Sequence, residues 1–271
     1  YKNKIILNEY DIIKEPKEID LEINGENYFN LKKLSKENGF TINSILQFII
    51  HKTLSIYGNS KQTIIGTTVS GRQLPINNIG ESVGLYINTL PLIIDHSEMD
   101  ENIIDAIKYT QDKINDMITK TNIDMSKLNI NGKKRDLFDC LFVFENYPDL
   151  TDKNKDNILK HEFYQSIEKT DSPISFIAFE SYNNSKNEES ITIKIIFENE
   201  IFDSRIIELL TNVILNLINQ IVFNKKEKIK DIIILPEDQL EKINEWNKTD
   251  EDYPELRDIN ITLKDIFENV V

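Results

Sequence analysis

The chain has 271 residues, of which 39% are hydrophobic and 9% aromatic, so it holds enough apolar side chains for a core and is not a disordered polypeptide. Its 46 acidic and 32 basic residues give a formal net charge of -14, which argues against nucleic acid as the main partner. The single cysteine excludes an internal disulfide and indicates a reducing, cytoplasmic location. No apolar run reaches the roughly 20 residues that span a bilayer, so no membrane segment is expected.

In the first half of the chain, alternating apolar residues indicate strands and apolar residues at helical spacing indicate helices. Residues 1–18 are rich in Lys and Glu and are expected to connect the domain to sequence upstream of it. Gly39 and Thr41 are typical of one helix end followed by the cap of a second helix. The predicted elements are, in chain order, a strand at 21–23, helices at 28–38 and 42–57, a strand at 63–69, a polar loop at 70–80 and a strand at 85–94.

In the second half, Asp100 and Asp203 are expected to stand at the starts of two long helices. Residues 247–260 are acidic and read as a linker, so the main domain is expected to span residues 19–236. Because helices and strands alternate, the sequence predicts an α/β or α+β sandwich with a mixed sheet and helices. The predicted elements are a helix at 100–118, strands at 137–145, 174–180 and 191–197, a helix at 203–223 and a helix at 237–246.

One short motif, G-x-S-x-G at residues 80–84, is compatible with a nucleophilic serine but lacks the setting that such a serine needs. The motif requires a strand before the serine and a helix after it. Here a loop precedes Ser82 and a strand-like stretch follows, which favours a glycine-flanked entry into a strand. Cys140 lies inside an apolar strand, where a cysteine is expected to act as a small buried hydrophobe rather than a nucleophile.

The three histidines predict no metal site and leave one alternative open for acid–base chemistry. His51, His96 and His161 lack metal-ligand spacing to one another and to the cysteine, so no metal is predicted. His96 follows Asp95, a pair compatible with a general base, although a histidine at the exposed end of a strand is the commoner case. The sequence has no P-loop and no G-x-G-x-x-G motif, so nothing predicts nucleotide binding.

The polar stretch Ser70-Gly71-Arg72 is the part of the glycine-containing loop that most needs an explanation. An arginine that ends a strand, with glycine beside it, suits a fixed ion pair or an anionic partner. Plain solvent exposure of Arg72 explains the pattern equally well, and the residues themselves leave both interpretations open.

Two neighbouring stretches, residues 67–72 (TTVSGR) and 83–91 (VGLYINTLP), resemble the C-terminal half of a condensation domain of a nonribosomal peptide synthetase. The second is similar to the VGxFxNTLP motif of that family. Residues 137–148 (LFDCLFVFENYP) resemble the family's LFD…VFENYP strand. Residues 246–268, which begin WNKT, look like the linker into an adenylation domain. The matches follow the order of the family and cover nearly the whole chain.

This resemblance implies a domain of two lobes, each like chloramphenicol acetyltransferase, with a tunnel between them. The chain would be the C-terminal lobe, and residues 237–271 the linker and the start of an adenylation domain. The implied reaction forms a peptide bond between donor and acceptor thioesters held by carrier proteins. The implied partners are the missing N-terminal lobe, the peptidyl carrier proteins and the downstream adenylation domain. The phosphopantetheine arms of the carrier proteins are substrates, and no cofactor is expected to bind directly.

The family's HHxxxDG motif is absent from the sequence and is expected in the other lobe, upstream of Tyr1. No catalytic residue is therefore assigned to this chain, and the chain alone is expected to be inactive. The resemblance implies that Arg72 pairs with the Asp of that motif. It places Ser70, Gly71 and Arg72 at the lobe interface, and Gly84, Tyr86, Asn88, Thr89 and Pro91 along the tunnel.

Two other functions stay open. The chain is compatible with a docking platform for carrier and adenylation domains that performs no chemistry. It is less compatible with a stand-alone acyltransferase that uses coenzyme A, because such an enzyme needs a catalytic histidine of its own and none is well placed.

Overall fold

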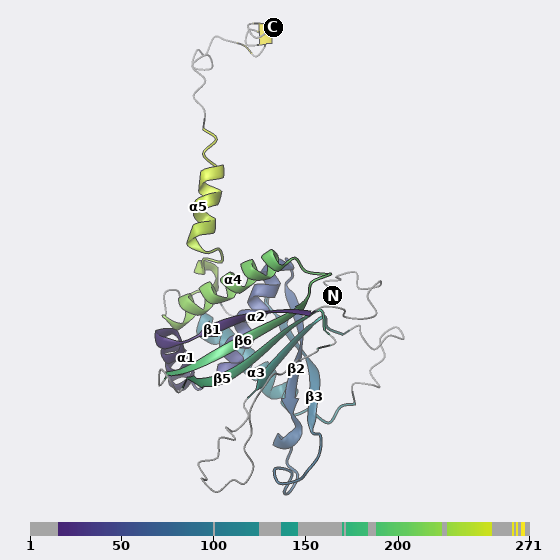
Figure 1. Cartoon of the computed structure of the whole chain (residues 1–271). Coiled ribbons are helices and arrows are strands. Elements are labelled where there is room, and N and C mark those ends of the chain that lie inside the picture. Colours follow the sequence, from purple (N-terminus) through teal and green to yellow (C-terminus); the bar gives the residue numbers. More distant parts are fainter. Residues whose placement is uncertain are drawn as a thin grey trace. The chain divides into compact units, whose positions relative to one another are not determined.

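The computed structural model describes residues 16–99, 101–124, 137–145, 172–183, 188–223 and 227–250, together with residues 170, 262, 264, 267 and 268. The chain divides into two compact units, residues 1–234 and residues 235–271. The first unit is a sheet covered by helices (Figure 1). Within the second unit, the predicted helix at 237–246 is present as α5 (Glu237–Trp246).

A single mixed sheet of six strands forms the frame of the first unit. Strand β4 runs parallel to both of its neighbours, and the other pairs are antiparallel. Strand β3 is an edge strand, which explains how it accommodates Pro91, since proline cannot donate a hydrogen bond to a second neighbour. Across the sheet the strands are β1 (Pro16–Ile23), β6 (Glu188–Glu198), β5 (Ile174–Asn183), β4 (Cys140–Glu145), β2 (Gln62–Ser70) and β3 (Ile87–Asp95).

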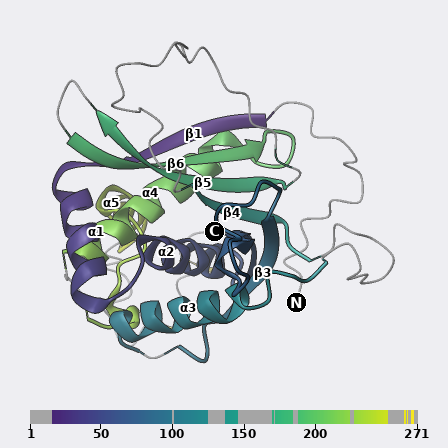
Figure 2. The same ribbon diagram turned by 90° about the horizontal axis from the view of Figure 1, so that it is seen from below.

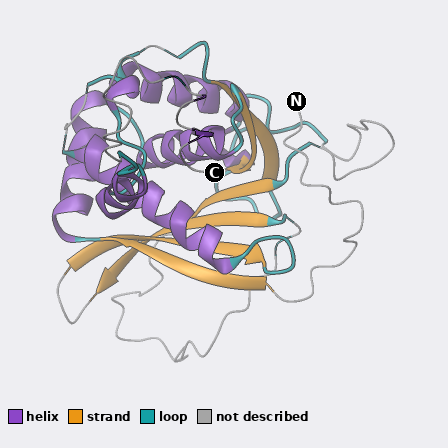
Figure 3. Cartoon of the chain, turned by 90° about the horizontal axis from the view of Figure 1, so that it is seen from above, coloured by secondary structure: helices purple, strands orange, loops and turns teal. Residues whose placement is uncertain are grey.

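Four helices form a layer on one face of this sheet, as Figures 2 and 3 show from opposite sides. They are α1 (Gly25–Asn38), α2 (Ile42–Tyr57), α3 (Ile103–Ile118) and α4 (Ser204–Val222). Helix α2 packs against both α3 and α4, and α1 packs against β6. The predicted mixed sheet with helices is therefore confirmed.

The core lies between the helix layer and the sheet. The alternation of residues along the strands determines which side chains enter it. Ile193, Ile195 and Phe197 alternate along β6 and are buried in the main core cluster. Leu21 of β1 is buried in the same cluster, whereas Asp20 beside it is exposed. The period of two that predicted these strands is thus also the pattern that separates their two faces.

Helix α4 corrects the expectation that no segment is long and apolar enough to cross a membrane. Among the described helices it alone meets that test, with 19 residues and a mean hydropathy of 1.3. Ile207, Ile214 and Leu217 of α4 are nevertheless buried in the core cluster, and half of the apolar window is buried inside the fold. Polar residues such as Asn216 interrupt the run in sequence, and we interpret α4 as a core helix.

Most predicted element ends agree with the structure, but the starts of five elements, β1, α1, α3, β4 and β6, differ by three residues or more. The hydroxyl group of Thr41 caps α2, and the carboxylate of Asp203 caps α4, as expected. Helix α3 begins at Ile103 and is capped by Asn102, whose Oδ1 accepts from a backbone N–H inside the first turn; the predicted Asp100 lies outside the described residues. Strand β4 begins at Cys140, later than predicted, because only from there does it pair with β5.

Replacing Thr41 by alanine is expected to lower the free energy of unfolding by about 1 kcal/mol, because the cap of α2 is lost. Its hydroxyl accepts from the backbone N–H of Ser44 (3.1 Å) and donates to Gln111 in α3 (2.8 Å). Chemical denaturation measures the effect. Thr119→Ala is the matched control, since that exposed hydroxyl bonds only the Asp116 carbonyl and its loss is expected to cost less than about 0.5 kcal/mol. Equal losses in the two variants would contradict the capping role.

Candidate functional site

The loop between β2 and β3, residues 71–86, is built around the side chain of Arg72 and is called the arginine loop below. Nη1 of Arg72 donates to the carbonyl oxygens of Ile79 (2.8 Å), Gly80 (3.3 Å) and Ser82 (2.9 Å). Its guanidinium carbon lies 4.7 Å from the centroid of the Tyr86 ring, within the range of a cation–π contact. One side chain therefore holds both halves of the loop together.

Ser70 and Gly71 position Arg72 through the backbone. The hydroxyl of Ser70 accepts from the N–H of Arg72 at 3.4 Å, at the start of a short 3₁₀ turn. The N–H of Gly71 donates to the carbonyl oxygen of Tyr86 at 2.9 Å. A Cβ atom at Gly71 would lie 2.6 Å from that oxygen, so the two ends of the loop approach as closely as they do only because residue 71 is glycine.

Ser82 has a structural partner on each side and none of the surroundings of a nucleophile. Its Oγ lies 2.9 Å from the carbonyl oxygen of Ile79 and 2.7 Å from Oη of Tyr86, so it can donate to the first and accept from the second. A turn precedes Ser82, and the next element is strand β3 rather than a helix. The strand–serine–helix order of a nucleophile elbow is therefore absent at this position.

The tip of the arginine loop carries apolar side chains into solvent. Val83 and Leu85 are 101% and 88% exposed, and Ile87 at the start of β3 is 50% exposed. Gly84 between them leaves room for the Tyr86 ring, because a Cβ there would lie 3.2 Å from Cε2 of that ring. These three side chains expose apolar surface in the arginine loop and at the start of β3.

The residues expected to line a tunnel do not all share one face. Nδ2 of Asn88 donates to the carbonyl oxygens of Thr121 and Ile123, both at 2.9 Å, beyond the end of α3. Because side chains alternate along β3, Thr89 and Pro91 point to the face opposite Asn88 and the helices. The side-chain amide of Asn88 is thus fully engaged in holding the segment that follows α3.

Sequence reasoning missed that two histidines meet at one threonine. Nδ1 of His51 in α2 lies 2.6 Å from Oγ1 of Thr63, and Nε2 of His96 lies 3.0 Å from the same oxygen. Burial lowers the pKa of His51 well below its usual value. Burial, and then the positive charge of Lys52, lower the pKa of His96 to about 4. Both rings are therefore neutral at pH 7.

The pair of His96 and Asp95, which the sequence left open as a general base, is not joined by a hydrogen bond in the structure. The Asp95 carboxylate accepts instead from the hydroxyl of Ser97, from the side chain of Gln62 and from the backbone N–H of Ser97, and these bonds lower its pKa to about 2. His96 therefore lacks the carboxylate that would orient and charge it as a general base. His161 lies outside the described residues.

Lowering the pH from about 7.5 to about 5 is expected to reduce the free energy of unfolding by up to roughly 4 kcal/mol, about 2 kcal/mol from each of the two histidines. The unfolded-state pKa of histidine is about 6.5, and both folded-state pKa values lie below it, so only the unfolded chain takes up protons in this window. Stability is complete above the unfolded-state pKa and is lost as the pH falls toward the folded-state pKa. Denaturant titrations at several pH values measure the slope.

The double variant His51→Asn with His96→Gln is the control for this slope. Asn and Gln keep a polar atom near the positions of the ring nitrogens that face Thr63 but do not titrate. The variant is expected to show a nearly flat profile between about pH 5 and 7.5, where carboxylates contribute little. An unchanged slope would assign the titration to groups other than these two histidines.

Two further features that the sequence raised are the single cysteine and metal binding. Cys140 is buried, as predicted, and burial raises the pKa of its thiol well above the usual value. Among the residues that the structure describes, no group of three or more His, Cys, Asp or Glu side chains is arranged to hold a metal ion.

A sequence model of condensation domains matches residues 11–244. The chain is 35% identical over 274 residues to N-(5-amino-5-carboxypentanoyl)-L-cysteinyl-D-valine synthase of Penicillium rubens, covering 98% of this chain and 7% of that protein. It is 28% identical over 251 residues to bacitracin synthase 3 of Bacillus licheniformis, covering 88% of this chain and 4% of that protein. The chain thus spans only 4% to 7% of the length of these two relatives.

Solved structures share the fold at low sequence identity. The X-domain from teicoplanin biosynthesis has a TM-score of 0.65 at 16% identity, over 82% of this chain and 50% of that one. The condensation domain of the Monacolin K polyketide synthase MokA has a TM-score of 0.61 at 13% identity, over 79% of this chain and 48% of that one. A four-domain nonribosomal peptide synthetase bound to AMP and glycine has a TM-score of 0.67 at 15% identity, over 83% of this chain and 18% of that one. The expected condensation-domain fold is therefore confirmed.

Proposed function

Because this chain belongs to the condensation-domain family, we propose that it is the C-terminal lobe of such a domain in a nonribosomal peptide synthetase. The share of the structural relatives that it covers supports this assignment, since it aligns with 50% of the teicoplanin X-domain and 48% of the MokA condensation domain. The sequence also contains VGLYINTLP, typical of that lobe, and no HHxxxDG, typical of the other.

The proposed reaction joins a donor acyl or peptidyl group to an acceptor aminoacyl group. The acceptor nitrogen attacks the donor thioester carbonyl carbon, a C–N bond forms and the C–S bond breaks. The thiol of the donor phosphopantetheine arm leaves with the proton that the amine gives up. An unprotonated amine held close to the carbonyl needs little further activation. The contribution of this lobe is therefore geometry rather than a base, and we assign no catalytic residue to it.

The observation that carries the proposal is the way in which Arg72 is anchored. Its Nη1 is fully occupied by loop carbonyls, whereas its Nε and Nη2 have no hydrogen-bond partner in the described part of the chain. These two nitrogens form the edge of a guanidinium that binds a carboxylate through two parallel hydrogen bonds. We assign this edge to the Asp of the HHxxxDG motif in the other lobe, with Ser70 and Gly71 as the residues that aim it.

The tunnel wall is proposed to run from the arginine loop into β3. Gly84 and Tyr86 contribute from the loop, and Thr89 and Pro91 contribute from the sheet face opposite the helices. Asn88 borders the same segment, and its amide fixes the backbone that follows α3. The phosphopantetheine arms of two carrier proteins would be the groups that enter this tunnel.

The remaining parts of the chain have proposed roles in a larger assembly. Residues 1–18 would connect the two lobes, although β1 already begins at Pro16, and residues 19–236 would form the lobe itself. Residues 237–271 would be the linker and the start of an adenylation domain. The carrier proteins and the adenylation domain would be partners in one cytoplasmic assembly line.

A peptide-bond assay with loaded donor and acceptor carrier proteins tests the proposal. The chain alone is compared with the chain extended upstream through the proposed N-terminal lobe. Product is expected only from the extended form, because the HHxxxDG motif is absent from this sequence. Product from the chain alone would refute the lobe assignment, and absence of product from an extended form with intact motifs would favour the docking platform.

A further inference from the structure

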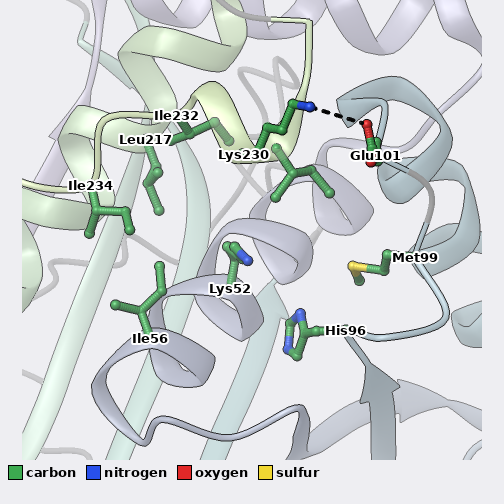
Figure 4. A pocket seen from close by; sticks show the side chains of 10 residues that line it. Lys52, Ile56, His96, Met99, Glu101, Leu217, Lys230, Ile232 and Ile234 are labelled. Carbon is green, nitrogen blue, oxygen red and sulfur yellow. Dashed lines mark ion pairs between the residues drawn. The ribbon is translucent and has the colours of Figure 1, made fainter.

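A cavity of about 370 Å³ lies at the other end of β3 from the arginine loop. The loop precedes Ile87 and the cavity residue His96 follows Asp95, so the length of β3, about 27 Å at roughly 3.4 Å per residue, separates the two. The volume is in the range of sites for small organic molecules. Six of the residues that line it are apolar, namely Ile56, Met99, Leu217, Ile229, Ile232 and Ile234, and all of these but Ile229 are labelled in Figure 4.

One wall of the cavity is a short segment fastened to α4 by side-chain amides. Gln220 donates to the carbonyl oxygen of Ile233 (2.6 Å) and accepts from its N–H (3.0 Å). Asn216 donates to the same carbonyl at 2.7 Å. These bonds fix residues 232–234 without the help of a strand partner, so this wall of the cavity is preformed.

Lys52 of α2 is the charge in this cavity that lacks a counter-charge. Within the described residues it has no hydrogen-bond or ion-pair partner, although the protein has 46 acidic residues. Figure 4 shows it among the apolar side chains, apart from the ion pair between Lys230 and Glu101. That pair, with 3.7 Å between Nζ and Oε2, is exposed and marks the rim.

An ammonium group beside apolar walls is unfavourable unless something pairs with it. The same burial lowers the pKa of Lys52. His96 is neutral at pH 7 and supplies no negative charge, and Glu101 is engaged by Lys228 and Lys230. A bound anion would therefore relieve a cost that the side chains around Lys52 leave in place.

We propose that this cavity binds a small organic carboxylate with an apolar body, whose carboxylate pairs with the ammonium of Lys52. The hydrocarbon part lies against Leu217 and Ile232, away from the rim. A single unpaired cation suits a monoanion better than a phosphate dianion, and the carboxylate of Glu101 at the rim disfavours a second negative charge. The inference does not depend on the proposed peptide-bond chemistry.

Calorimetric titration of the 271-residue chain with hexanoate tests the proposal, with 1-hexanol as a neutral probe of similar shape. Hexanoate is expected to bind at least tenfold more tightly than hexanol, because a desolvated charge pair adds to the apolar contact. Lys52→Met keeps the length and apolar character of the side chain and is expected to weaken hexanoate at least tenfold while leaving hexanol unchanged. Lys230→Met is the matched control, because that lysine is already paired, and a change below about threefold is expected.

Two further measurements keep the result interpretable. Circular dichroism and a thermal melt verify that Lys52→Met folds, and its melting temperature is expected to equal or exceed that of the natural chain, because an unpaired charge is removed. Equal affinity for hexanoate and hexanol, or equal hexanoate affinity in the natural chain and a folded Lys52→Met variant, would overturn the proposal. Absence of hexanoate binding at about 10 mM would also overturn it. That result would indicate that water at the cavity mouth hydrates the ammonium group of Lys52.

Discussion

Replacing Arg72 by alanine in the two-lobed domain is expected to slow peptide-bond formation by roughly 100-fold or more. The substitution removes Nη1 from the carbonyls of Ile79 and Ser82 and removes the stacking partner of Tyr86. The loop then loses its central fastening, and the proposed carboxylate of the other lobe loses its bidentate partner. Single-turnover measurements with loaded carrier proteins report the loss, and thermal melts of the same samples separate it from unfolding.

Two comparison variants make this result specific. Arg72→Lys keeps the charge but offers a point donor that cannot contact three carbonyls, a ring and a carboxylate at once, so it is expected to rescue little of the rate. Arg205→Ala removes another exposed arginine, which pairs with Asp203 at the start of α4, and is expected to leave the rate within about twofold. If folded Arg72→Ala forms peptide bonds at the rate of the unsubstituted domain, the interface role is refuted. Equal losses of rate in Arg72→Ala and Arg205→Ala would attribute the effect to net charge.

The sequence predicts most elements of the fold because the signals that define them are local. Thr41 and Asp203 act as caps through backbone N–H groups only two or three residues away, so the residue type and its position suffice to find them. The start of α3 is harder, because Asp100 and Asn102 are both capping residues and the choice depends on contacts from elsewhere. The N–H of Ile103 donates to the carbonyl of Glu227, which fixes the helix start from a segment far along the chain.

The functional geometry depends on contacts between residues that are distant in sequence. His51 and His96 meet at Thr63 because α2 packs on β2 and β3 pairs with β2, and no spacing rule links their positions. The cavity around Lys52 likewise needs α4 and the segment after it. By contrast, the opposite orientations of Asn88 and Thr89 follow from the period of two along a strand, and this signal was already in the sequence.

Replacing Gly71 by alanine is expected to destabilise the fold by about 1–3 kcal/mol and to reduce peptide-bond formation together with it. The added Cβ would lie 2.6 Å from the carbonyl oxygen of Tyr86, which is backbone and cannot rotate away. The hydrogen bond from the N–H of Gly71 to that oxygen is then stretched or broken. Since Arg72 follows directly, its guanidinium shifts with the backbone. Chemical denaturation and the carrier-protein assay measure the two effects.

Gly80→Ala provides the control within the same loop. Neither glycine has a positive φ, so alanine strains the backbone at neither position, and a Cβ at Gly80 meets nothing within 4 Å. Its carbonyl remains available to Arg72, and the expected change in stability is within about 0.5 kcal/mol. The two variants therefore differ only in whether the new methyl group separates the two ends of the loop. A large loss of stability and activity in Gly71→Ala alone would show that the close approach of residues 71 and 86 sets the position of Arg72. Similar stability and activity in both variants would show that the loop adjusts freely. That result would remove the structural basis for the interface proposal.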